Sequence, residues 1–409
     1  MSAAFSVSQV RARLVSVRRR RVKKRFNAHL MAGRPVAEDR PARDRPRDRL
    51  PGLTARQVTQ HVLRLDDGQQ VGVAVTGAGV PFVVLHGIGL HNRTYERCLS
   101  YLPEFGFLAV AIEAPGHGHS SPVARGADFT TRVDPIRRAV DALGIRRAVV
   151  AGHSMGGRSA ACFTALNPER VLAAVFIDAA LGGDWDNALI KRLSSEVEVV
   201  RGLVDGIVDA AGDTRNITWP ERLAYYRMLS GPGRPHLADL ARIPQVARAI
   251  AVAESDQWLA AIRAAAVPVV VLNGARDLVI PLSDARAVAA RLDAPLLTVA
   301  DGYHSWLLAS PRTFAATMAR TFADGTAMPR SAAACFDPDA LVLRWTALPP
   351  RLLPPRPDET LLDWRVEGLS GTRRRESARA GDRAADWAAD SHRSHRWAAG
   401  AAPPARRPR

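Results

Sequence analysis

The sequence predicts an α/β protein with a mostly parallel central sheet of about eight strands, flanked by helices. The main observation is that short apolar runs of strand length alternate with helical patterns between about residues 58 and 325. The second is the composition, because 47% hydrophobic and 24% charged residues are ordinary for a globular protein. The 409 residues leave room for two or three domains.

The expected strands open with a hairpin that turns at Asp66-Asp67-Gly68. Two helices are expected between the later strands, one from Asp128 to Gly144 and one from Met155, and a last helix is expected after the final strand, from Ser310 with Pro311 at its first position. The expected strands are 61–65, 70–75, 81–85, 107–112, 147–151, 171–177, 267–272 and 296–299.

One stretch breaks the alternation, and it defines the predicted domain organisation. Residues 182–263 have helical patterns, no strand and several aromatic residues, which is typical of a helical cap or lid inserted between two strands. The predicted core is therefore made of residues 56–181 and 264–325.

Most of the positive charge lies at the two ends of the chain. The formal net charge is +17, and residues 1–55 hold 15 Lys and Arg against four Asp and Glu. Residues 326–409 hold 15 against ten and are rich in Ala, Arg and Pro. Such segments bury too little apolar surface to fold, so both are predicted to be disordered tails. The basic run 18–25 could attract nucleic acid or an anionic membrane, but the same Arg bias follows from GC-rich coding, and no specific nucleic-acid partner is expected.

Cysteine content and hydropathy bear on location and cofactors. Cys98, Cys162 and Cys335 are too few and too scattered for a disulfide framework or a zinc site. No run of about 18 apolar residues occurs, and no apolar segment follows the basic run as in a secretory signal. A cytoplasmic protein without a transmembrane segment is expected. No phosphate loop, metal cluster or dinucleotide motif is present, so no cofactor is expected.

The strongest local motif is Gly152-His153-Ser154-Met155-Gly156-Gly157, between an expected strand and an expected helix. Small residues two before and two after a serine are needed where a strand turns sharply into a helix. Such a turn raises Ser154 Oγ above the sheet as a nucleophile. The loop His86-Gly87-Ile88-Gly89 follows another strand, and the amides of Ile88 and Met155 are the expected oxyanion donors.

A nucleophilic serine needs a base and an acid that orients the base. His304 follows the strand 296–299 within Gly302-Tyr303-His304, and Asp277 follows the strand 267–272. Both positions are just past strand ends, where open α/β sheets place their sites. Asp178, directly after the strand 171–177, is the alternative acid. The predicted catalytic residues are Ser154, Asp277 and His304.

Five motifs in this order resemble the α/β-hydrolase fold superfamily over residues 58–325. They are the loop 86–89, Pro115-Gly116-His117-Gly118-His119-Ser120, the motif 152–157, Gly274-x-x-Asp277-x-x-x-Pro281 and Gly302-x-His304. The likeness is greatest to lidded esterases, cofactor-free haloperoxidases or perhydrolases, and carbon–carbon hydrolases of ring-fission products. Glu113, Ala114 and Asp134-Pro135 depart from the usual pattern. Relatives that use Asp as nucleophile, the haloalkane dehalogenases and epoxide hydrolases, differ at Ser154.

The resemblance implies a serine hydrolase that cleaves a small-to-medium, apolar carboxylic ester through an acyl-enzyme. The alternatives on the same triad are carbon–carbon bond hydrolysis and perhydrolysis. A different class is a non-catalytic binding protein whose basic arm recognises nucleic acid or a membrane. The expected partner is a small-molecule substrate, and association into a homo-oligomer stays open.

Overall fold

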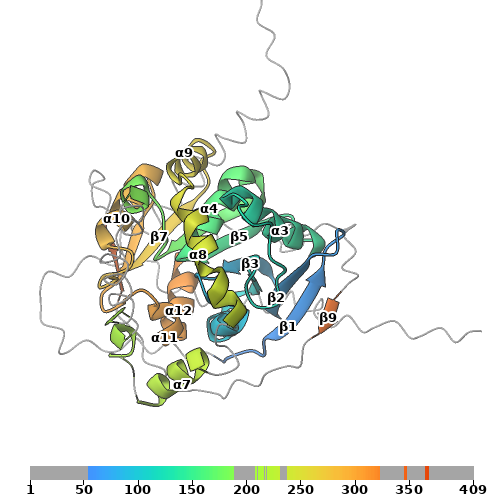
Figure 1. Ribbon diagram of the computed structural model, residues 1–409. Helices are drawn as coiled ribbons and strands as arrows, with labels where there is room; N and C mark the ends of the chain where they lie inside the picture. The colour runs from blue at the N-terminus through green and yellow to red at the C-terminus, as the bar shows by residue number, and fades with distance from the viewer. Residues whose placement is uncertain are drawn as a thin grey trace, which may run out of the picture.

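The computed structural model describes residues 54–187, 208–209, 211–215, 217, 219–230, 237–322, 345–347 and 364–367. These residues fold around one central sheet with helices on both of its faces (Figure 1). The strands are β1 (Thr59–Arg64), β2 (Gln70–Gly77), β3 (Val80–Leu85), β4 (Phe107–Ile112), β5 (Ala148–His153), β6 (Val171–Ile177), β7 (Val269–Gly274), β8 (Leu296–Val299), β9 (Trp345–Ala347) and β10 (Trp364–Glu367).

The helices of the described residues differ widely in length, and three of them are short 3-10 turns. They are η1 (Asn92–Tyr95), α2 (Glu96–Tyr101), η2 (Leu102–Phe105), α3 (Phe129–Ala142), α4 (Met155–Leu166), η3 (Pro168–Arg170), α7 (Trp219–Ser230), α8 (Leu237–Ala251), α9 (Asp256–Ala264), α10 (Leu282–Leu292), α11 (Trp306–Ala309) and α12 (Pro311–Thr321).

The strand order across the sheet is β10-β8-β7-β6-β5-β3-β4-β2-β1-β9. Strands β3 to β8 pair in parallel, whereas β2 runs antiparallel to β4 and β1 antiparallel to β2. The carboxyl ends of six parallel strands therefore meet at one edge. The predicted fold class is confirmed: all eight expected strands are present, each within two residues of its expected ends.

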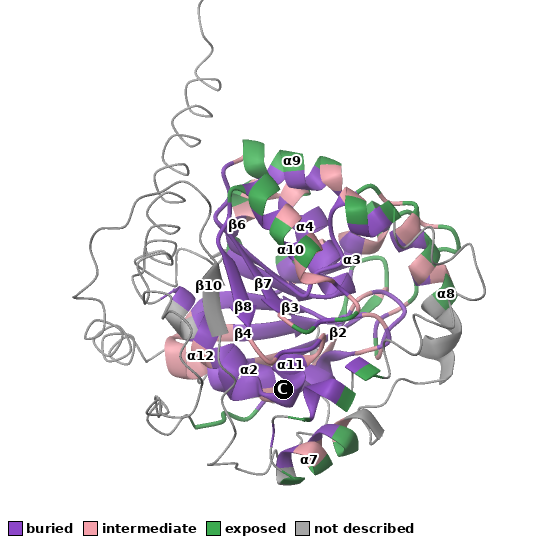
Figure 2. Cartoon of the chain, turned by 90° about the vertical axis from the view of Figure 1, so that its left-hand side faces the viewer, coloured by how far each residue is buried: buried purple, intermediate pink, exposed green. Residues whose placement is uncertain are grey.

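Alternate residues of each central strand enter two separate hydrophobic clusters. On β3, Val83 and Leu85 pack with α3, α4, α9 and α10, while Phe82 and Val84 pack with α2, α11 and α12. Because successive side chains of a strand point to opposite faces, a strand buried on both sides carries a continuous apolar sequence. Figure 2 shows this arrangement, with buried strands between α4, α9 and α10 on one side and α2, α11 and α12 on the other.

Seven residues of the segment 326–409, which is predicted to be a disordered tail, lie in two short strands. β9 pairs antiparallel with β1, and β10 pairs antiparallel with β8, so these short strands extend both edges of the sheet. Three or four residues are too few to produce a periodic pattern, and their pairing depends on strand edges far away in the sequence. The predicted N-terminal tail up to residue 53 lies outside the described residues.

The segment predicted as a cap is helical or turn-like wherever the structure describes it. Its helix α7 contacts α11, which follows the predicted catalytic histidine. Its last helix, α9, packs on α4 and α10, so that α9 lies in the helical layer over the sheet. Helices α7 and α9 of the insertion thus lie on opposite sides of the sheet.

Candidate active site

Ser154 occupies a strained turn between β5 and α4. Its backbone has φ 56° and ψ −122°, a conformation that non-glycine residues rarely adopt. The chain passes so close to itself here that a Cβ on Gly152 would overlap the carbonyl of Gly156, and one on Gly156 would overlap the carbonyl of Leu85. The small residues that predicted the turn are therefore required by its geometry.

The loop after β3 lies against the nucleophile. An ideal Cβ built on Gly87 would be 3.4 Å from Ser154 Cβ. Within this loop the amides of Gly87, Gly89 and Leu90 donate to the Tyr95 hydroxyl, to His117 Nε2 and to the Gly87 carbonyl.

The two amides predicted as oxyanion donors belong to the loop after β3 and to the first turn of α4. For the Ile88 amide, no hydrogen-bond acceptor is found among the described residues. Met155 is the first residue of α4, where backbone N–H groups have no partner inside the helix. The helix dipole adds partial positive charge at the same place.

His304 and Asp277 meet at the ends of β8 and β7. His304 Nδ1 is 2.9 Å from Asp277 Oδ2, and the side chains are 13% and 0% exposed. The other oxygen of Asp277 accepts the amides of Val279 and Ile280 at 2.7 and 2.8 Å, which fixes the carboxylate. Burial lowers the pKa of His304, but the negative charges of Asp277 and of Asp209 outweigh that effect and leave the pKa above 6.5.

A buried histidine connects the His304 loop to the loop after β3. His153 Nε2 lies 2.8 Å from the His304 carbonyl oxygen, and the two imidazole rings are 4.9 Å apart. Because a carbonyl only accepts, Nε2 carries the proton, and Nδ1 accepts from the Tyr95 hydroxyl at 2.6 Å. Burial lowers the pKa of His153 to about 3, so the ring is neutral at pH 7. A chain of hydrogen bonds thus runs from Gly87 through Tyr95 and His153 to His304.

Asp178, the alternative acid, serves other partners. It is fully buried, and its oxygens accept the amide of Gly274 at 2.7 Å and the indole N–H of Trp306 at 2.8 Å. Burial and the nearby Asp277 carboxylate raise its pKa well above the usual range. The hydrogen bond of the His304 ring goes to Asp277, so the geometry favours Asp277 as the orienting acid.

Two groups that contact this site were not predicted from the sequence. Tyr95 comes from η1, and Asp209 comes from the insertion, where it accepts the amide of His304 at 2.7 Å. Neither residue belongs to a recognisable motif, and each contact joins segments far apart in the chain. Within the part of the chain that the structure describes, no group of three or more His, Cys, Asp or Glu is arranged to hold a metal ion.

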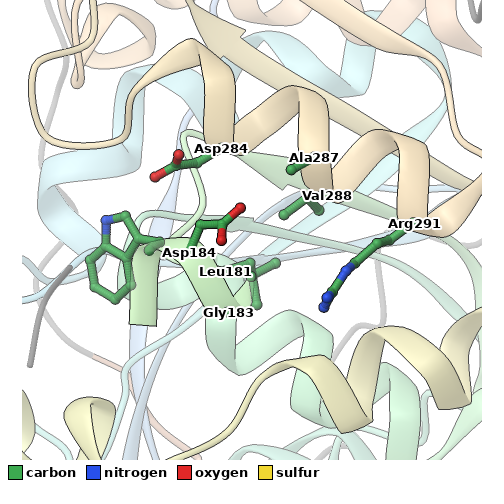
Figure 3. A pocket seen from close by; sticks show the side chains of 9 residues that line it. Leu181, Gly183, Asp184, Asp284, Ala287, Val288 and Arg291 are labelled. Carbon is green, nitrogen blue, oxygen red and sulfur yellow. The ribbon is translucent and has the colours of Figure 1, made fainter. Parts of the chain in front are cut away.

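Two small pockets flank α4 and α10. One lies between residues 181–185 and α10, and neither Ser154 nor His304 lines it (Figure 3). The second is lined by Met155, Phe129 and Val246 of α8, among other residues, and again by neither Ser154 nor His304. Met155 directly follows Ser154 in the chain, so the second pocket begins one residue away from Ser154. Among the described helices, none is both long and apolar enough to cross a bilayer.

Comparisons with known proteins bear on the fold and the family of the chain. The family model described as "Alpha/beta hydrolase family" matches residues 82–317. A "Putative non-heme haloperoxidase" of Mycobacterium phage D29 is 33% identical over 266 residues, which are 64% of this chain and 94% of the relative. A "2-hydroxy-6-oxononadienedioate/2-hydroxy-6-oxononatrienedioate hydrolase" of Paraburkholderia phymatum is 32% identical over 157 residues, 37% of this chain and 54% of the relative.

Among solved structures, an esterase from Exiguobacterium antarcticum is 21% identical with a TM-score of 0.51, over 63% of this chain and 97% of the esterase. At that identity the likeness concerns the fold alone. The family model matches more than half of the chain, and its range includes Ser154, Asp277 and His304. The chain belongs to the alpha/beta hydrolase family.

Proposed function

We propose that the protein is a serine hydrolase that cleaves a small-to-medium, apolar carboxylic ester through an acyl-enzyme. The observations that carry this proposal are the strained Ser154 turn and the 2.9 Å hydrogen bond between His304 and Asp277. His153, the residue before Ser154, connects the two places through its hydrogen bond to the His304 carbonyl. A nucleophile, a base and an orienting acid just past the carboxyl ends of three parallel strands, β5, β8 and β7, are the parts that acyl transfer requires.

In the proposed reaction, His304 Nε2 takes the Ser154 hydroxyl proton while Oγ attacks the ester carbonyl carbon. Asp277 accepts from Nδ1, which leaves Nε2 as the base and stabilises the imidazolium. The amides of Ile88 and Met155 donate to the oxyanion. The imidazolium then gives its proton to the leaving alcohol, and water, activated by His304, releases the acid from Ser154.

The pocket beside Met155 has a mixed lining, in which Phe129 and Val246 lie together with His117, Arg132 and Ser159. Val246 belongs to α8 of the insertion, so residues 182–263 are proposed to act as the lid over the substrate. A pocket enclosed partly by such a segment accepts ligands according to their length and shape.

The experiment compares reaction of a fluorophosphonate probe with the wild type, with Ser154→Ala and with Ser283→Ala, an exposed serine of α10. Labelling of the wild type and of Ser283→Ala, and none of Ser154→Ala, is expected. Hydrolysis of nitrophenyl esters of increasing chain length then measures the substrate size. Loss of Ser154 or His304 should lower kcat by about 10⁴ to 10⁶-fold. Absence of labelling in folded wild type would favour a non-catalytic binding protein.

A second candidate function is perhydrolysis, in which hydrogen peroxide replaces water in attacking the acyl-enzyme. The similarity to a protein named as a non-heme haloperoxidase over 94% of its length favours this candidate. Peracid formation from acetate and peroxide, followed by bromide-dependent halogenation of monochlorodimedone, would identify it. Carbon–carbon hydrolysis, suggested by the name of the Paraburkholderia relative, is tested with a vinylogous diketone.

A further inference from the structure

The insertion places a buried carboxylate between the two loops that carry the proposed acid and base. Asp209 is 2% exposed. Its Oδ1 accepts the amide of His304 at 2.7 Å, and its Oδ2 accepts the amide of Leu278 at 2.8 Å. Leu278 directly follows Asp277 in the chain, so a single side chain joins the backbones of the loops after β7 and β8.

The same part of the insertion touches the histidine loop at a second place. Asp213 is four residues after Asp209, 3% exposed, and accepts the amide of Ser305 at 2.9 Å. Between the two acids, the backbone of Gly212 lies against the ring of Tyr303, where an added Cβ would be 2.5 Å from a ring carbon. The short segment around residues 209–213 is therefore seated directly on the loop that carries His304.

We propose that Asp209 is a positioning residue: by accepting the amides of Leu278 and His304 it holds the two loops in the register that the Asp277–His304 hydrogen bond needs. This inference rests on the proposed triad. Hydrogen bonds from amides to a carboxylate are stronger than those between neutral groups, and two of them fix both loops at once. The catalytic pair is aligned only while the insertion is seated on the loops.

Burial and a neighbouring carboxylate both disfavour a negative charge on Asp209. The two amide hydrogen bonds favour that charge, so they are the contacts that stabilise the carboxylate at this position. Burial raises the pKa of Asp209, and the neighbouring carboxylate of Asp277 raises it further, while the amides of Leu278 and His304 lower it. If Asp209 only filled space, a neutral side chain of the same size would stabilise the fold at least as well as a carboxylate beside other carboxylates. Here its two oxygens satisfy two buried amides that would otherwise lose their acceptors.

Asp209 also adds negative charge near the imidazole. Several other titratable groups surround His304 on the elements packed against it. They are Asp277 after β7, His153 at the end of β5, Asp213 beside Ser305, Asp178 behind Asp277, and the exposed Asp301–Arg276 pair in the adjoining loops. Removing the charge of Asp209 is expected to lower the pKa of the His304 imidazolium, because one of the two carboxylates that raise that pKa disappears.

The test measures kcat and KM of the full-length chain for a nitrophenyl ester across pH, for wild type, Asp209→Asn and Asp301→Asn, with Ser154→Ala as the blank. Asn has one acceptor oxygen, and its NH₂ group would face an amide N–H. We expect kcat to fall roughly 10- to 100-fold with KM within about threefold, and the acid limb of kcat/KM to move to lower pH. Asp301→Asn also removes one negative charge, three residues before His304, but from a half-exposed ion pair. The kcat of this control variant should stay within about twofold of the wild-type kcat.

The acid limb gives the pKa of the active enzyme whatever fraction of the preparation is folded, so partial misfolding of Asp209→Asn does not blur the result. Wild-type kcat with an unmoved acid limb would overturn the inference, as would a loss of activity fully matched by a loss of folded protein. If Asp209→Asn yields no folded protein, Asp209→Glu, which keeps the charge but displaces it, must lower kcat. Failure of the proposed function gives a different result from failure of this inference, because wild type and Ser154→Ala would then hydrolyse the ester at equal rates.

Discussion

The guanidinium of Arg158 joins both ends of the insertion to the helix that follows the nucleophile. Its side chain is 0% exposed and donates to Asp186 Oδ1 at 2.6 Å, to the carbonyl of Ala180 at 2.9 Å and to the carbonyl of Ala253. The other oxygen of Asp186 accepts the amide and hydroxyl of Ser255 at 3.1 and 2.8 Å. Three aromatic rings lie around the guanidinium, from Phe129, Trp185 and Trp258.

Replacing Asp186 by Ala should lower the free energy of unfolding by about 3–5 kcal/mol. The reason is that Arg158 would remain buried and charged with only carbonyl oxygens as acceptors, and Ser255 would lose its partner. Domains of this kind have about 5–15 kcal/mol of stability in total, so the loss would be severe. Replacing both partners, as Arg158→Met with Asp186→Leu, removes the uncompensated charge and should recover more than half of the loss.

Urea unfolding followed by tryptophan fluorescence and far-UV circular dichroism measures these free energies. The control is Asp301→Ala, which breaks an ion pair with Arg276 whose side chains are 42% and 51% exposed, and it should cost less than about 1 kcal/mol. The reasoning is refuted if Asp186→Ala costs no more than this control. It is also refuted if the effects of Arg158→Met and Asp186→Leu, each measured alone, simply add in the double variant.

Three further predictions concern the proposed triad and its surroundings. Asp277→Asn should lower kcat about 10³ to 10⁴-fold, far more than Asp178→Asn, and ester kinetics that rank the two in the opposite order would contradict the assignment. The rate should rise with pH through a pKa above 6.5, because His304 must lose its proton to act as the base; a pH profile with a limb below 6.5 would disagree. The free energy of unfolding should fall as the pH is lowered from about 6.5 to 3. The reason is that the buried His153 has a pKa of about 3 in the folded protein and gains its proton more easily when unfolded. Urea titrations of wild type and His153→Gln at pH 7 and 4.5 measure this loss with and without the imidazole.

The strands and the nucleophile turn were predictable because their signals are local. A strand buried on both faces needs a continuous apolar run, as in Phe107–Ile112 and Val171–Ile177, whose predicted ends agree with the structure. The turn at Ser154 requires glycine where its backbone nearly touches itself, so that requirement is written in adjacent residues. Asp277 and His304 were predicted to lie near each other because each comes just after the end of a strand in the parallel sheet.

Other features depend on contacts between distant segments, and no local pattern announces them. β9 and β10 exist because short runs in a Pro- and Arg-rich segment pair with the free edges of β1 and β8. The His304 ring is hydrogen-bonded to Asp277 and not to Asp178, because the loops after β6 and β7 place the two carboxylates differently.

By itself, the sequence determined the fold class, the strained serine turn and the candidate acid and base, because each of these is encoded by residue type and spacing over a few positions. Only the tertiary structure decided which carboxylate meets the imidazole, that Tyr95 and His153 link the loops after β3 and β8, and that Asp209 reaches the loops after β7 and β8 from the insertion. The physical reason is that hydrogen bonds between buried groups depend on distances across the fold, which the chain sets only when all of its elements are packed.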